Sequence, residues 1–194
     1  MKPITLGVLG SGSGSNFQAL LDAIRDDRLN ATVAIVLSDQ PDAGILDRAR
    51  QQGVPHGIID CAGHTTRFPD KEQIRVACLM KEAGVDLVCL AGFMRLVKKP
   101  LLDAFPGKIL NIHPSLLPSF PGLEAWRQAL EAGVRETGCT VHIVDAGVDT
   151  GPVVMQERVV IEPGDTPASL HARIQEAEHR LYPAAVSLLA RSHE

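Results

Sequence analysis

The chain has few cysteines, and their spacing argues against two kinds of cysteine site. Its 194 residues include only Cys61, Cys78, Cys89 and Cys139. No two of them form a Cys-x-x-Cys pair, the spacing typical of zinc sites and redox motifs. Three lie in apolar or mixed stretches of the kind that form protein cores. We therefore interpret the cysteines as reduced thiols, and expect neither a disulfide framework nor a metal ligand among them.

The chain also lacks an excess of basic residues and any long apolar run. Its formal net charge is -4 and its pI is about 6.0, whereas a general nucleic-acid binder shows a basic balance or stripe. No apolar run approaches membrane-spanning length, and the apolar N-terminal stretch is too short for a signal peptide. We expect a soluble, cytoplasmic protein with no nucleic-acid or membrane partner.

Apolar strands alternate with amphipathic helices in the first half of the chain, a pattern that predicts a doubly wound, mostly parallel α/β sheet. The expected strands there are residues 4–9, 32–37, 57–59 and 85–91, and the expected helices are residues 16–25, 43–52 and 71–83. In the second half we expect a strand at residues 108–113 and a helix at 123–132. An antiparallel hairpin at 139–144 and 153–161 and a final helix at 166–190 should follow.

Neither an internal repeat nor a linker divides the sequence. We therefore expect a single domain over residues 1–194, with a phosphate-binding half at about 1–105 and a catalytic half at about 106–194. Ligands of open α/β sheets bind beyond the carboxyl ends of the strands. Unusual polar or Gly-rich segments lie at the ends of three expected strands, at residues 10–16, 111–113 and 145–151. Their coincidence predicts a site at this edge.

The first of these segments, residues 10–16, reads Gly-Ser-Gly-Ser-Gly-Ser-Asn. Glycines let backbone N–H groups approach an anion, and the following helix N-terminus adds free donors, so a phosphate is a reasonable ligand. No Lys-Ser/Thr follows, so this is not a Walker loop. A tight turn capped by Asn16, or an imperfect nicotinamide site in which Asp39 binds the ribose, remains an alternative.

Asn111 and His113 lie two residues apart in an expected strand, so both side chains share a face. Pro114 holds His113 in an extended conformation. A carboxylate from Asp149 would favour the imidazolium and orient the ring for proton transfer, while Asn111 could stabilise an oxyanion. The alternatives are ordinary turns, or a metal site formed by His113, His142 and Asp149 without any tight ligand spacing.

Four motifs carry a resemblance to a known family: Gly12-Ser13-Gly14-Ser15-Asn16, Leu90-Ala91-Gly92-Phe93-Met94-Arg95, Asn111-Ile112-His113-Pro114-Ser115-Leu116-Leu117-Pro118 and Asp149-Thr150-Gly151-Pro152. From about Ile4 to Ala190, the chain resembles the phosphoribosylglycinamide formyltransferases of the 10-formyltetrahydrofolate formyltransferase superfamily. The resemblance implies a formyltransferase fold. It also implies transfer of a formyl group from 10-formyltetrahydrofolate, as cosubstrate and without a metal, to the amine of glycinamide ribonucleotide in purine synthesis.

The resemblance also assigns roles to residues. His113 would transfer protons, Asn111 would stabilise the oxyanion, and Asp149 would position and charge the histidine. The ribonucleotide ligands would be Gly14, Ser15, Asn16 and Glu178. The folate ligands would be Arg67, Met94, Arg95, Leu96, Val97, Asn111, Asp145 and Asp149. The surroundings of Arg67 depart from the usual pattern, since Pro69 follows closely.

Other activities remain open at this stage. A formyltetrahydrofolate hydrolase would use water in place of the amine, but such enzymes usually carry a regulatory domain. A methionyl-tRNA formyltransferase would add a tRNA-binding domain. A nicotinamide dehydrogenase or a non-catalytic, nucleotide-binding Rossmann-like module would not need the Asn–His–Asp trio. The sequence leaves open whether the protein is a monomer or a homodimer.

Overall fold

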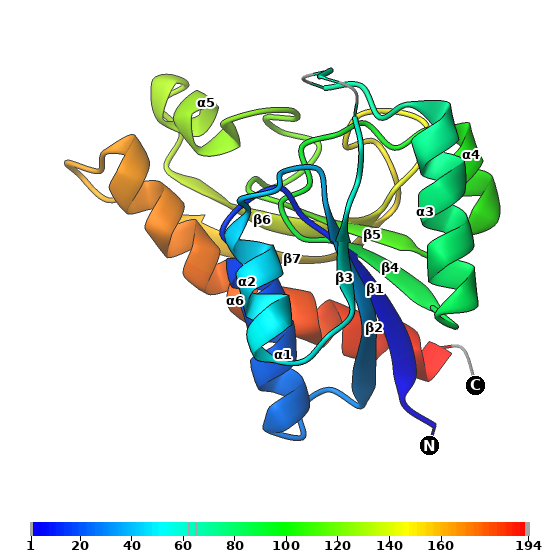
Figure 1. The fold of residues 1–194 in the computed structure, drawn as a ribbon. Coiled ribbons are helices and arrows are strands. Elements are labelled where there is room, and N and C mark those ends of the chain that lie inside the picture. The colour runs from blue at the N-terminus through cyan, green and yellow to red at the C-terminus, as the bar shows by residue number, and fades with distance from the viewer. Residues whose placement is uncertain (1, 62, 65, 193–194) are drawn as a thin grey trace.

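The computed structural model describes residues 2–61, 63–64 and 66–192, and its centre is one seven-stranded sheet in the order β3-β2-β1-β4-β5-β6-β7 (Figure 1). The first five strands pair in parallel, and β6 and β7 continue the sheet antiparallel. The predicted mixed sheet with a C-terminal hairpin is therefore confirmed. The strands are β1 Ile4–Leu9, β2 Ala31–Ser38, β3 His56–Ile58, β4 Leu87–Leu90, β5 Ile109–His113, β6 Glu136–Ile143 and β7 Val153–Val160.

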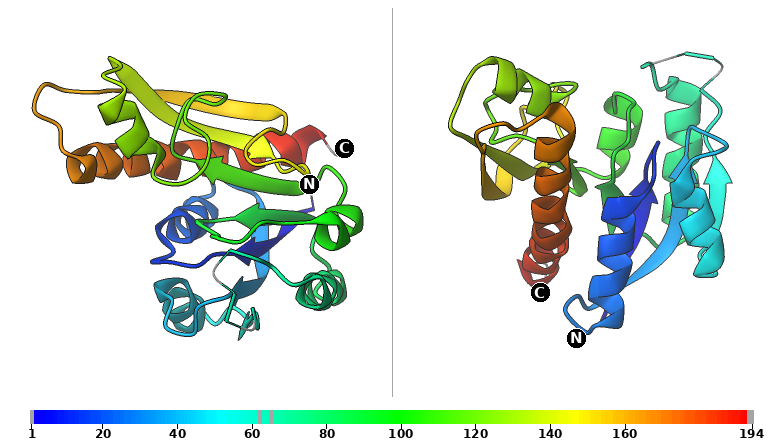
Figure 2. Two further views of the ribbon diagram at one scale, coloured as in Figure 1. Left: turned by 90° about the horizontal axis from the view of Figure 1, so that it is seen from above. Right: turned by 90° about the vertical axis from the view of Figure 1, so that its left-hand side faces the viewer.

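Helices cover both faces of the sheet (Figure 2). They are α1 Ser15–Arg25, α2 Gly44–Gln51, α3 Asp70–Glu82, α4 Lys99–Ala104, α5 Ala125–Glu131 and α6 Pro167–Ser192. One core cluster joins α1, α2 and α6 to the sheet, and the other joins α3 and α4 to it. Apolar side chains thus fill both interfaces, as the near-continuous apolar strands predict.

The sequence missed one helix and misplaced several ends by a few residues. Helix α4 is only six residues long, has a proline in its first turn and fully buries only Leu101, so it has no apolar stripe to detect. The predicted strand at residues 85–91 is shorter, Leu87–Leu90. Thr166 accepts a hydrogen bond from Ser169 N at 3.2 Å, which identifies it as the cap that begins α6. The helix continues through Pro183.

The loop after β1 packs against the chain that leaves β4. Strand β1 lies between β2 and β4. The chain that leaves β1 therefore runs toward β2 and the chain that leaves β4 runs toward β5, and the two diverge to leave a crevice at the carboxyl edge of the sheet. Ser11 N donates to Gly92 O at 3.0 Å, and a Cβ on Gly10 would lie 2.8 Å from Ala91 O. Glycine at position 10 therefore permits the two loops to touch.

The register of β5 against β6 places Asn111 opposite His142. Residues directly opposite in an antiparallel pair project from the same face of the sheet. His113, two residues beyond Asn111, shares that face as predicted. The hairpin thus adds a second imidazole to the expected pair.

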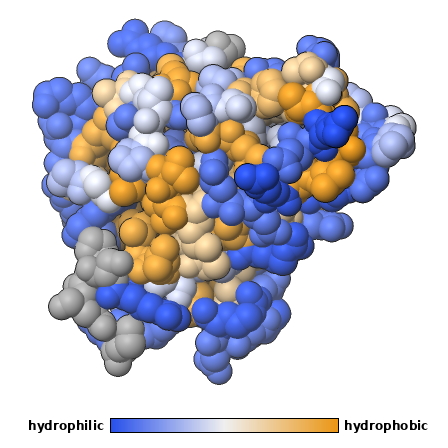
Figure 3. Space-filling model, turned by 180° about the vertical axis from the view of Figure 1, so that it is seen from behind, coloured by the Kyte–Doolittle hydropathy of each residue, from blue (hydrophilic) through white to orange (hydrophobic). Residues whose placement is uncertain are grey.

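In the part of the chain that the structure describes, no helix is both long and apolar enough to cross a membrane. The rear of the molecule carries several apolar patches separated by hydrophilic side chains (Figure 3).

Candidate active site

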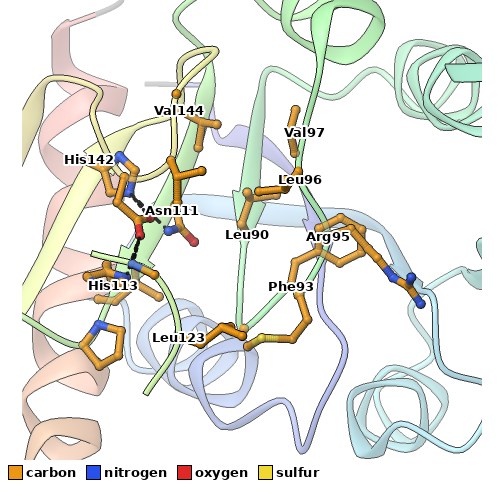
Figure 4. A pocket seen from close by; sticks show the side chains of 18 of the residues that line it. Leu90, Phe93, Arg95, Leu96, Val97, Asn111, His113, Leu123, His142 and Val144 are labelled. Atoms are coloured by element: carbon orange, nitrogen blue, oxygen red, sulfur yellow. Dashed lines mark hydrogen bonds and ion pairs between the residues drawn. The ribbon is translucent and has the colours of Figure 1, made fainter. Parts of the chain in front are cut away.

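A cavity of about 550 Å³ opens at the carboxyl edge of the sheet (Figure 4). Four segments supply its lining, drawn from residues 90–98, 111–114, 122–126 and 142–149. Three of these segments hold residues that the sequence assigned to catalysis or to folate binding. The cavity therefore brings together parts of the chain that are up to about sixty residues apart, counting from Leu90 to Asp149.

The three predicted catalytic residues all line this cavity, and Figure 4 shows Asn111 and His113 at one end of it. His113 Nδ1 lies 3.4 Å from Asp149 Oδ2. Asn111 projects from the same strand face as His113 and reaches the second imidazole, His142, at 3.1 Å. Amide, imidazole and carboxylate thus form one contiguous polar cluster beside an otherwise apolar space.

The environment of His113 favours the neutral imidazole. Burial lowers the pKa of His113 below its ordinary value, and this outweighs the opposing effects of the Phe120 carbonyl and the Asp149 carboxylate. Asp149 raises the pKa of His113 as expected, but desolvation is the larger effect and makes the net shift downward. His113 Nε2 lies 2.9 Å from Phe120 O, a pure acceptor, so Nε2 carries the proton. The Nδ1 lone pair is then free to take up a proton beside Asp149.

Asp149 is held as a carboxylate by its contacts. Burial opposes ionisation, but contacts with His142, with the Gly122 N–H and with His113 outweigh it and hold the pKa of Asp149 below its ordinary value. Gly122 N donates to Asp149 Oδ2 at 2.8 Å. The Asp149 backbone has φ 54°, a left-handed conformation that aspartate tolerates better than most residues. Because β6 runs antiparallel to β5, it ends opposite Leu110, near the start of β5. The loop after β6 therefore turns back to bring Asp149 to His113, at the end of β5.

His142 belongs to the site, although the sequence analysis named it only as a possible metal ligand. Its Nδ1 lies 3.1 Å from Ile143 O, a pure acceptor, so Nδ1 donates this hydrogen bond. Nε2 can then accept a hydrogen bond from Asn111 Nδ2. This contact fixes which way the Asn111 amide points. The signal that could have found it is the register of the predicted hairpin against the 108–113 strand.

The segment at residues 94–97, which we call the folate edge because the resemblance assigns it to folate binding, forms an apolar wall of the cavity. Met94, Leu96, Val97 and Asp145 all line it, as do the newly identified Leu123 and Val148. Met94 is 55% exposed and Leu123 is 70% exposed, so apolar side chains stand open at the mouth. Asp145 Oδ1 accepts from Gly147 N at 3.0 Å and from Thr150 Oγ1 at 2.7 Å. Its carboxylate therefore shapes the 145–151 loop.

The two arginines expected at the folate site lie differently. Arg95 contributes to the lining, but its guanidinium points away from the Asn111–His113 cluster (Figure 4) and binds Asp39 at 2.6 Å. Arg67 is exposed and lies outside the cavity lining. Its backbone forms a parallel bridge with Leu96. Thr65, in the unusual surroundings of Arg67, falls outside the described residues.

The predicted phosphate loop lies at the start of α1. Gly14 has φ 75° and makes no side-chain capping bond. A Cβ at this position would lie 2.7 Å from Ile45 Cα. Asn16 Nδ2 donates to Glu178 Oε2 at 2.8 Å, while the buried Asn16 Oδ1 has no partner among the described residues. Burial raises the pKa of Glu178 to about 7, against the opposing effect of this hydrogen bond. Three of the four predicted ribonucleotide ligands, Gly14, Ser15 and Asn16, are consecutive, and the fourth, Glu178, contacts Asn16.

The structure weakens two of the alternatives. The nicotinamide interpretation needs Asp39 to bind a ribose, but this carboxylate is occupied by Arg95 and by Ser11 Oγ at 2.5 Å. For the metal interpretation, residues 2–61, 63–64 and 66–192 contain no group of three His, Cys, Asp or Glu placed to hold an ion. Cys61, Cys89 and Cys139 are buried, and burial raises the pKa of the Cys89 and Cys139 thiols to about 12, so neither suits nucleophilic chemistry.

A doubly wound sheet with a neutral imidazole, a carboxylate and an amide beside an apolar cavity defines an α/β enzyme of the group-transfer kind. The chain belongs to the formyl transferase family, whose pattern it matches over residues 5–186. The expectation from the four motifs is confirmed at this level.

Named relatives support a narrower assignment. The chain is 42% identical to phosphoribosylglycinamide formyltransferase of Escherichia coli, over 94% of this chain and 85% of that protein. It spans only 18% of the human trifunctional purine biosynthetic protein adenosine-3, to which it is 44% identical over 97% of its own length. Glycinamide ribonucleotide transformylase 1 from Symbiobacterium toebii has the same fold, with a TM-score of 0.93 and 53% identity over 98% of this chain and 89% of that one.

Proposed function

We propose that this chain transfers the formyl group of 10-formyltetrahydrofolate to the amine of glycinamide ribonucleotide, in de novo purine biosynthesis. The observation that carries the proposal is the convergence of Asn111, His113 and Asp149 at one end of an apolar-walled cavity. The identity to the Escherichia coli and Symbiobacterium toebii enzymes supports the choice of substrates.

The residues present fit a folate donor. A cavity of about 550 Å³ lies within the range of small-molecule sites, and apolar side chains of Met94, Leu96 and Val97 suit the flat face of a pterin ring. Backbone groups of this edge and of the 145–149 loop can bond its polar rim. Arg95 contributes to folate binding through its backbone, because its guanidinium is bound to Asp39.

The ribonucleotide phosphate fits the N-terminus of α1. The backbone of Gly14, Ser15 and Asn16 forms the N-terminus of α1, where unpaired N–H groups and the helix dipole favour an anion. Glu178 and Asn16 Oδ1, a buried oxygen that no described residue contacts by a hydrogen bond, offer acceptors for hydroxyl groups of the ribose. The substrate amine then extends toward the cavity end that holds His113.

The chemistry requires no nucleophile from the protein. The amine nitrogen attacks the formyl carbon, a C–N bond forms, and the carbonyl electron pair moves to oxygen. The Asn111 amide donates to this oxyanion. The proton lost by the attacking nitrogen passes to His113 Nδ1, where Asp149 stabilises the imidazolium. His113 returns the proton to N10 of the folate as the C–N10 bond breaks and the carbonyl re-forms.

The direct test is a formyl-transfer assay with purified protein, glycinamide ribonucleotide and 10-formyltetrahydrofolate. Formylated ribonucleotide and tetrahydrofolate should appear in equal amounts, and neither should appear when the amine is omitted. Folate turnover without the amine would identify a hydrolase instead. Absence of turnover with both substrates present would refute the proposal.

A further inference from the structure

Three side chains outside the catalytic cluster form a buried polar link between two loops. Asp39, just beyond β2, accepts from Arg95 Nε at 2.6 Å and from Ser11 Oγ at 2.5 Å. The Arg95 and Asp39 side chains are only 6% and 1% exposed. Ser11 Oγ also accepts a hydrogen bond from Met94 N at 2.9 Å. We call Ser11, Asp39 and Arg95 the linker cluster.

The linker cluster lies between the two proposed substrate sites. Ser11 belongs to the loop that continues into Gly14–Asn16, the proposed phosphate site. Met94 and Arg95 begin the apolar edge that lines the folate cavity. Through its two hydrogen bonds, the Ser11 hydroxyl contacts both the carboxylate of Asp39 and the backbone of that edge.

The cluster has a fixed geometry because its charges are buried. Breaking a buried ion pair leaves an unpaired charge, which is strongly unfavourable, so Arg95 and Asp39 have little freedom to separate. Arg95 Nη1 also donates to His64 O, and Gln40 Nε2 donates to Asp39 Oδ2 at 2.8 Å. The Asp39 carboxylate is held by three side chains from three parts of the chain.

We propose that Ser11, Asp39 and Arg95 are positioning residues that couple the two substrate sites, so that either substrate bound tightens binding of the other. This inference rests on the proposed function. Because the buried Arg95–Asp39 pair and the Ser11 hydroxyl hold the two loops together, a shift of Ser11 when a ligand binds at the phosphate loop moves the Met94 N–H on the folate edge with it. Both ligands then favour the same arrangement of the two loops, which is the condition for positive coupling.

The coupling is measured by calorimetry with two unreactive probes, glycinamide ribonucleotide and tetrahydrofolate without its formyl group. The dissociation constant of each is measured alone and with the other saturating. Wild-type protein should bind each probe about fivefold or more tightly when the other is present, and by the same factor in both directions. Binding of neither probe would refute the proposed function, whereas binding of both with no mutual effect would refute the coupling alone.

Two variants test the cluster itself. Ser11→Ala removes the shared hydroxyl and leaves the Arg95–Asp39 pair in place, so the fold should survive. Asp39→Asn keeps the shape of the side chain and removes its charge. In both variants the coupling factor should fall to about one, the value for independent sites.

The matched control is Asp165→Asn. Asp165 also forms an ion pair, with Arg173 at 2.8 Å, in which the Asp165 side chain is 4% exposed and that of Arg173 is 35% exposed, but it lies just before α6, outside the cavity lining. This variant should keep the wild-type coupling factor. If Ser11→Ala lowers the melting temperature yet keeps that factor, the cluster is only structural and the inference is wrong.

Discussion

Asn111 and His142 face each other across the β5–β6 ladder, and Asn111 Nδ2 lies 3.1 Å from His142 Nε2. His142 Nε2 also lies 3.6 Å from Asp149 Oδ1. The second imidazole therefore lies between the proposed oxyanion donor and the proposed carboxylate. It orients the amide that must meet a developing negative charge, and preorganised donors of this kind supply much of enzymatic rate enhancement.

Replacing His142 should slow the reaction more than it weakens binding. In His142→Ala the Asn111 amide loses its acceptor, so we expect kcat to fall roughly 10- to 100-fold because the donor is misplaced. KM for both substrates should change little. His142→Gln places an oxygen acceptor near the former Nε2 and should recover part of the rate. Equal losses in the two variants would contradict an orienting role.

Replacing His113 should remove most of the rate and leave binding intact. General acid–base catalysis contributes about 10²- to 10⁴-fold, so His113→Ala should lose about that much in kcat. Calorimetry with each substrate should still show binding, because the apolar wall and the phosphate loop are unchanged. The exposed His56 on β3 supplies the control, since His56→Ala should turn over like wild type. Wild-type turnover in His113→Ala would sink the assigned role.

The acid limb of the pH–rate profile should report the His113 proton acceptor. Burial holds the pKa of His113 below its ordinary value, so the neutral form persists at pH 7 and kcat should fall only as the pH drops below about 6.5. Asp149 acts in the opposite direction and raises this pKa. Asp149→Asn should therefore move the acid limb to still lower pH while it also lowers the plateau. A shift of the limb to higher pH would contradict this electrostatic relationship.

Local patterns in the sequence predicted much of this site, and distant pairings account for what they missed. The period of a strand placed Asn111 and His113 on one face, and a glycine-rich loop located the start of α1. His142 could not be added without the register of β6, which follows a connection of more than twenty residues after His113. The Asp39–Arg95 pair joins residues 56 positions apart, and neither has a flanking pattern that points to the other. The resemblance assigned Arg95 to the folate site; its guanidinium is an internal contact with Asp39, and the residue still lines the cavity.

The net direction of the His113 pKa shift could not be predicted from the sequence for a related reason. The sequence showed a carboxylate that could approach the ring, but not how deeply the ring would be buried. The His113 side chain is only 5% exposed, and this desolvation exceeds the attraction of Asp149. Burial is a property of the whole packed fold, so no local motif reports it.

Glu178 should make stability depend on pH in a defined window. Its pKa is raised by burial to about 7, from an ordinary value of 4.5. The folded protein thus holds a proton that the unfolded chain releases. The stability that this bound proton contributes to the folded protein is fully present below pH 4.5 and is lost as the pH rises through about 7. A shift of this size corresponds to roughly 3 kcal/mol at most.

Glu178→Gln tests this contribution, because glutamine is always neutral and can still contact Asn16. The difference in free energy of unfolding between variant and wild type, measured by urea titration without ligands, cancels the effect of the histidines. That difference should be small at pH 5 and should favour the variant increasingly up to pH 8. Glu131→Gln, an exposed change on α5, should show no such trend. A difference that is constant with pH would mean that Glu178 ionises as readily in the folded protein as in the unfolded chain.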